Sequence, residues 1–147
     1  MSSTIQLTSL NWDAALKAIR GALEQAEKLE IAVCAVVMDR GGNQIAAGRD
    51  PRAPFHSQSI AADKATTAAG FGMPTSQWWG FVEQMNSPGI TAGLPTTDRL
   101  VVFGGGVPIY QGGELIAGIG VSGGSEEQDE ECARAGLALA GLNAEPG

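Results

Sequence analysis

The two most apolar stretches of this chain are Ile31-Ala-Val-Cys-Ala-Val-Val-Met38 and Leu115-Ile-Ala-Gly-Ile-Gly-Val121. Apolar residues occupy successive positions in both, and the first is rich in β-branched side chains. This pattern is typical of a strand that is covered on both faces. We therefore expect the two stretches to be central strands that lie side by side in one sheet.

Turn signals on either side of these stretches predict three further strands. Arg40-Gly-Gly-Asn43 predicts a hairpin turn into a partner strand over 44–49. Glycine-rich turns also separate predicted strands over 100–103 and 107–111 from the second apolar stretch. Because hairpins join neighbouring strands antiparallel, the expected sheet is five-stranded and mainly antiparallel.

Helical patterns flank and divide the predicted strands. Apolar residues at helical spacing predict a helix capped by Thr8 or Ser9 and running to Leu29, and further helices are expected at 57–69, from 74 or 75 through the aromatic residues 78–81, and at 126–142. Ser125 and Gln128 have the spacing of a capping box at the start of the last of these helices. Residues 86–98 contain two prolines and two glycines and are predicted to form a loop, a candidate lid. The expected order is α-β-β-α-α-β-β-β-α, an α/β (α+β) domain spanning 1–147.

Composition limits the classes of partner. The 147 residues suit one domain, and a formal net charge of −7 argues against nucleic acid and anionic membranes as partners. No apolar stretch is long enough to span a bilayer, and the first residues lack the pattern of a signal peptide, so we expect a cytoplasmic protein. The two cysteines have no metal-binding spacing and are expected to be buried, reduced and without a metal.

Two glycine-rich turns are the strongest local signal for a binding site. Backbone N–H groups presented without side chains, one set of them at a helix N-terminus, favour a carboxylate, a phosphate or a developing oxyanion. The alternative is that both are only tight turns. The predicted substrate-binding residues are Gly104, Gly105, Gly106, Ser122, Gly123 and Gly124.

Charged residues near these turns are candidates for chemistry. Lys64 lies on an apolar helical stripe and could bind an anion, act as a base or form a Schiff base, or it could pair with Asp129 or another acid in a structural role. Asp129 or Glu127, at the start of the last predicted helix, could act as a general acid or base. Arg49 ends a predicted edge strand and is a candidate to bind a substrate carboxylate.

The single histidine and the paired tryptophans complete the candidate site. His56 is either a surface residue at a helix entrance or a proton shuttle, since its ordinary pKa is the one nearest neutrality. Trp78 and Trp79 either serve packing and subunit contacts or form an aromatic wall for a planar ligand.

Four stretches in one order and spacing resemble the GlcG/HbpS family, which includes the C-terminal part of PduO-type proteins. The matching residues are Val36-Val-Met-Asp-Arg-Gly-Gly42 with Arg49-Asp50, Ser57-x-x-x-Ala61-x-x-Lys64-Ala65, Gly104-Gly-Gly-Val-Pro108, and Gly118-Ile-Gly-Val-Ser-Gly-Gly124 with Glu127-Gln-Asp-Glu130. The resemblance implies a profilin-like sheet flanked by helices and a homo-oligomer, a dimer or larger. It also implies scattered functions, among them haem binding and Pictet–Spengler condensation.

Two functions remain open from the sequence. The residues favour a small-molecule enzyme that uses acid–base chemistry without a metal for a condensation, cyclisation, isomerisation or hydrolysis of an anionic or carbonyl compound. The resemblance implies the alternatives, a haem-binding protein or a non-catalytic ligand-binding or sensor subunit. Apart from haem, no cofactor is expected.

Overall fold

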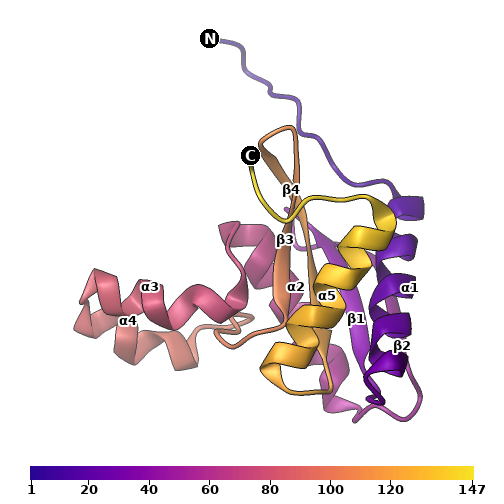
Figure 1. The fold of residues 1–147 in the computed structure, drawn as a ribbon. Helices are drawn as coiled ribbons and strands as arrows, with labels where there is room; N and C mark the ends of the chain where they lie inside the picture. The colour runs from indigo at the N-terminus through magenta and orange to yellow at the C-terminus, as the bar shows by residue number, and fades with distance from the viewer.

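The computed structural model describes residues 1–147 as a sheet between two layers of helices (Figure 1). Helices α1 (Trp12–Lys28) and α5 (Glu126–Ala140) cover one face, and α2 (His56–Phe71) covers the other. Helix α1 begins after Asn11, whose side chain accepts a hydrogen bond from the Asp13 N–H. The predicted cap at Thr8 or Ser9 was therefore wrong by two or three residues.

The sheet has the order β2-β1-β4-β3, and every neighbouring pair is antiparallel. Its strands are β1 (Cys34–Asp39), β2 (Gln44–Arg49), β3 (Gly106–Gln111) and β4 (Glu114–Ser122). Strands β1 and β4 lie side by side in the centre, with Val36 opposite Gly120. The predicted hairpin and the central position of the two most apolar stretches are thus confirmed.

The sheet has four strands rather than the predicted five, because residues 100–103 do not form a strand. The Val101 N–H donates to the Thr67 hydroxyl of α2 at 3.0 Å instead of pairing with a neighbouring strand. Arg99, just before it, has a φ of 59°, which interrupts extended backbone. The apolar character of residues 100–103 predicted a strand, but this segment packs on helix α2 instead.

Residues 75–96, which we call the arm, project from the body of the molecule (Figure 1). They contain α3 (Trp78–Met85), α4 (Pro88–Gly93) and two short 3₁₀ turns, η1 (Thr75–Gln77) and η2 (Leu94–Thr96). The predicted loop over 86–98 is thus largely helical. The Ser87 hydroxyl caps α4 by accepting a hydrogen bond from the Ile90 N–H. Pro88 occupies the first turn, where a backbone N–H would have no partner within the helix, so its missing N–H costs nothing.

The core is divided by the sheet. Val37 and Ile119 belong to the larger cluster under α1 and α5, and Val36 belongs to a smaller one under α2. On the α2 side, Gly118 and Gly120 of β4 leave no room for side chains, because a Cβ at Gly118 would lie 2.5 Å from the Ala65 carbonyl oxygen. The backbone of helix α2 therefore packs directly on the backbone of β4, which places its Lys64 at the sheet's glycine-rich end.

Candidate functional site

Lys64 and Asp129 form an ion pair in the interior, between α2 and the start of α5. The Lys64 Nζ lies 3.1 Å from Asp129 Oδ2 and donates to the Val121 carbonyl oxygen at 2.9 Å. Their exposed fractions are 1% and 3%. Burial lowers the pKa of Lys64, and the Asp129 carboxylate opposes this shift. The structural pairing, one of the two alternatives for Lys64, is the arrangement found.

The glycine-rich turns close around this pair. A Cβ at Gly105, where φ is 129°, would lie 2.6 Å from Lys64 Nζ, so a side chain there would collide with the amine. The Phe103 ring lies over the same atom, 5.1 Å from Nζ to the ring centroid, and Phe103 is 44% exposed. One aromatic side chain thus lies over an enclosed ammonium group.

Three of the N–H groups expected to bind an anion donate instead to side chains of the chain itself. The Gly104 N–H donates to Glu126 Oε1 at 2.7 Å, and the Gly106 N–H donates to the Thr75 hydroxyl at 2.9 Å. The Gly124 N–H donates to Asp129 Oδ1 at 2.8 Å. Two carboxylates of the chain, Glu126 and Asp129, therefore accept from N–H groups that were predicted to bind a substrate anion.

The first turn of α5 is an acidic surface. Ser125 and Gln128 form the predicted capping box. Glu127 is exposed beside Glu126 and Glu130 in a shallow hollow, and Ser76 donates to Glu130 there at 2.6 Å. Glu127 makes no contact with Lys64 among the hydrogen bonds and ion pairs, so the predicted carboxylates separate into a buried Asp129 and a solvated Glu127.

His56 and Arg49 lie away from the buried pair. His56 is exposed at the first position of α2, with its ring 4.2 Å from that of Phe55. Arg49, at the end of β2, donates through Nη2 to the Ala53 carbonyl oxygen at 3.0 Å. The structure therefore does not gather the predicted site residues into one pocket.

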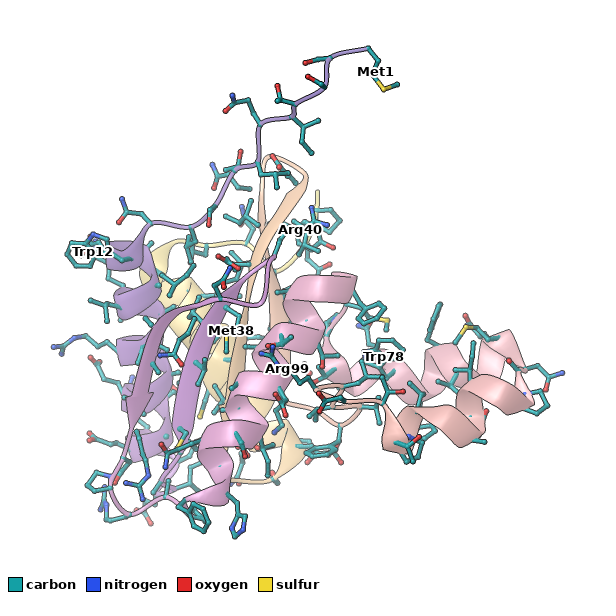
Figure 2. All side chains as sticks on the ribbon, turned by 180° about the vertical axis from the view of Figure 1, so that it is seen from behind. Met1, Trp12, Met38, Arg40, Trp78 and Arg99 are labelled. Carbon is teal, nitrogen blue, oxygen red and sulfur yellow. The ribbon has the colours of Figure 1, made fainter.

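The arm encloses a groove that sequence reasoning missed. The groove has a volume of about 490 Å³ and is lined mainly by apolar side chains of α3, α4 and the residues flanking the arm: Phe71, Trp78, Phe81, Met85, Ile90, Leu94 and Leu100. Trp78 lies at the base of the arm (Figure 2), and its buried Nε1 has no hydrogen-bond partner. Trp79 is 44% exposed and is not among the lining residues. Ser87 followed by Pro88 is a local signal for a helix start, and it could have predicted helix α4, whose residues form one wall of the groove.

Comparisons with known proteins agree with this fold. The family model described as haem degrading protein HbpS-like matches residues 10–138. A crystal structure of HbpS is 36% identical with a TM-score of 0.84, covering 93% of this chain and 94% of that one. A crystal structure of a PduOC–haem complex is 29% identical with a TM-score of 0.83, covering 94% of this chain and 99% of that one.

A longer relative matches over part of its length. The corrinoid adenosyltransferase PduO of Salmonella typhimurium is 34% identical over 122 residues, 81% of this chain. The chain spans only about a third of that protein, 35% of its length. None of the helices here combines the length and apolar character that crossing a bilayer requires. The match over residues 10–138 places the chain in the HbpS-like family, which confirms the resemblance drawn from the four sequence stretches.

Proposed function

We propose that this chain is a haem-binding protein and that haem binds in the groove of the arm. The observation that carries the proposal is the groove itself, which is walled by aromatic and aliphatic side chains. A relative of nearly the same length was crystallised as a haem complex, and the family is described as haem-degrading. Haem is preferred to the acid–base enzyme because Lys64 and Asp129, the predicted catalytic pair, are enclosed and already bonded to each other, to the Val121 carbonyl and to the Gly124 N–H.

The lining of the groove suits a flat, largely apolar tetrapyrrole. Its volume of about 490 Å³ lies within the range of cofactor pockets. Phe71 and Phe81 both pack edge-on against Trp78, at centroid distances of 4.9 and 6.0 Å. The unpartnered Trp78 N–H is an orphaned donor, and an acceptor atom on a ligand would satisfy it.

Met85 is the side chain in the groove that can bind iron. A methionine thioether is an established haem ligand, and bound haem would supply a redox-active iron centre here. His56 lies at the opposite end of α2 from Phe71. Helix α2 has 16 residues, so its ends are about 22 Å apart. The histidine of the same chain therefore cannot reach iron held in the groove.

Absorbance titration with haemin tests the proposal and its ligand together. The wild-type protein and His56→Ala are expected to give the same saturable Soret change at one haem per chain. Met85→Leu, which keeps the apolar volume and removes the thioether, should alter the Soret position and weaken binding. Met73→Leu is the matched control, because Met73 packs near Trp78 without lining the groove.

The titration can also refute the proposal. Unsaturable binding in the wild type would mean that the chain does not bind haem. Loss of binding in His56→Ala, with Met85→Leu unchanged, would place haem at the start of α2 and refute the groove as the site.

The acid–base enzyme predicted from the sequence remains a second proposal, favoured by one observation. The Phe103 ring lies over the Lys64 amine, 5.1 Å from Nζ to the ring centroid, and is itself 44% exposed. If its ring swings away, a carbonyl compound could form a Schiff base with Lys64. Incubation with an aldehyde and cyanoborohydride should then label Lys64, as detected by mass spectrometry. Labelling of exposed Lys17 alone would contradict this role.

A further inference from the structure

A smaller hollow, of about 210 Å³, opens where β2 passes the start of α2. Helix α2 packs on β4, β1 and β3, so the α2-facing side of β2 is left partly uncovered. The buried Cys34 of β1 lines the hollow together with Gln44, Ala47 and Arg49 of β2 and with Gln58 of α2. It shares no residue with the groove of the arm.

The Arg49 guanidinium enters this hollow without a counter-ion. Six of the nine lysines and arginines take part in ion pairs, and Arg49 is one of the three that do not. Its Nη2 donates to the carbonyl oxygens of Pro51 and Ala53, and the Arg49 side chain is also hydrogen-bonded to the Cys34 thiol, which leaves part of its five N–H donors without an acceptor. The neighbouring Asp50 carboxylate is held by Arg52 at 2.7 Å. Arg49 therefore keeps donors available.

The other polar groups around the hollow also favour a negative ligand. The carboxamides of Gln44 and Gln58 are exposed at the hollow and take part in none of the side-chain hydrogen bonds of the chain. Helix α2 has no acidic residue in its first turn, and its N-cap residue Phe55 makes no side-chain capping bond. Its positive end is therefore uncompensated, whereas α5 begins with three acidic residues.

We propose that this hollow binds a small organic carboxylate, with the free donors of Arg49 on the carboxylate oxygens and the two carboxamides on the other polar atoms of the ligand. A volume of about 210 Å³ admits an acid of a few carbons and excludes a tetrapyrrole. Burial raises the pKa of the Cys34 thiol, against the opposing effect of Arg49, so the thiol places no negative charge beside the guanidinium.

Titration with propionate, followed by NMR of the backbone amides, tests this assignment on the intact chain. We expect saturable shifts at residues 47–49 and 58 in the millimolar range and none with propionamide, the neutral analogue of the same shape. Arg49→Gln should weaken binding by about tenfold or more, the usual loss for hydrogen bonds to a charged group. Arg40→Gln is the control, because Arg40 also lacks an ion pair but lies in another hollow beside Asp39.

A second variant separates binding from folding. Arg49→Gln also removes the bonds that hold the 50–54 segment and could disturb it. Ala47→Leu instead fills the hollow from an exposed position and leaves Arg49 in place, and it should abolish the propionate shifts. Wild-type binding in Ala47→Leu, equal shifts with propionamide, or shifts with phosphate but not propionate would each overturn the assignment. None of these outcomes bears on haem in the arm.

Discussion

The buried ion pair between Lys64 and Asp129 is the most consequential contact between single residues. Each partner is enclosed, and the Asp129 oxygens accept from both Lys64 and the Gly124 N–H. Removing one partner would leave a buried charge without compensation, which is far more costly than losing an exposed pair. The pair joins α2 to the start of α5 and so fixes the glycine-rich end of the sheet.

Asp129→Asn is therefore expected to lower the free energy of unfolding by about 3–5 kcal/mol, measured by urea denaturation. The matched control is Asp13→Asn, which breaks the exposed pair with Lys17 at 3.5 Å and should cost less than about 1 kcal/mol. The double variant Lys64→Met with Asp129→Asn should recover part of the loss. Equal costs for the two single variants would contradict a structural role for the buried pair.

The sequence predicted the contacts of single residues correctly where both partners lie close together along the chain. The capping box of Ser125 and Gln128 was predicted correctly because both partners lie within one helical turn. The pairing of Lys64 with Asp129 was only one of two alternatives, since their side chains meet through tertiary packing. The turn N–H groups were expected to be free, and the sequence could not show that Glu126 and Thr75 would accept from them.

Among the elements, the contact between α2 and β4 depends on the absence of side chains. Gly118→Ala is expected to destabilise the fold by about 1–3 kcal/mol, because the added Cβ would lie 2.5 Å from the Ala65 carbonyl oxygen and 2.6 Å from the Ala69 nitrogen. Gly70→Ala, in the last turn of α2, meets nothing within 4 Å and should instead stabilise by up to about 1 kcal/mol. Thermal and urea unfolding of the two variants compare them directly, and a Gly118→Ala protein as stable as Gly70→Ala would refute this packing.

The elements predicted correctly were those with strong periodic or apolar patterns. Strands β1, β2 and β4 and helices α2 and α5 appeared near their expected bounds. The fifth strand was wrong because residues 100–103 bond to α2 through Thr67, a contact between distant parts of the chain. The helix α4 was missed because its two glycines and its proline resemble a loop, although its Ser87 cap is a local signal.

On the scale of the whole molecule, the arm presents unusual apolar surface. Phe71, Trp79, Phe81 and Ile90 are between 38% and 62% exposed on or beside it. Exposed apolar patches of this kind mark contact surfaces. We therefore expect the homo-oligomer implied by the family resemblance to use the outer face of the arm.

Light scattering after size-exclusion chromatography tests this expectation. The wild-type protein should elute as a dimer or larger, and Trp79→Ser, which changes an exposed residue outside the groove, should shift it toward the monomer. Trp12→Ser is the control, since Trp12 is 64% exposed at the start of α1, on the body of the molecule. An unchanged mass for the arm variant would show that the subunits meet elsewhere.

A pair of glycine variants distinguishes haem bound in the groove of the arm from haem bound elsewhere on the chain. Gly93 lines the groove and Gly80 does not, and a Cβ at either meets nothing within 4 Å. Gly93→Phe should weaken haemin binding by at least about tenfold in a Soret titration, because the added ring would occupy part of the volume that haem needs. Gly80→Phe should bind one haem per chain like the wild type. Haemin binding by Gly93→Phe as tight as in the wild type would contradict haem binding in the groove of the arm.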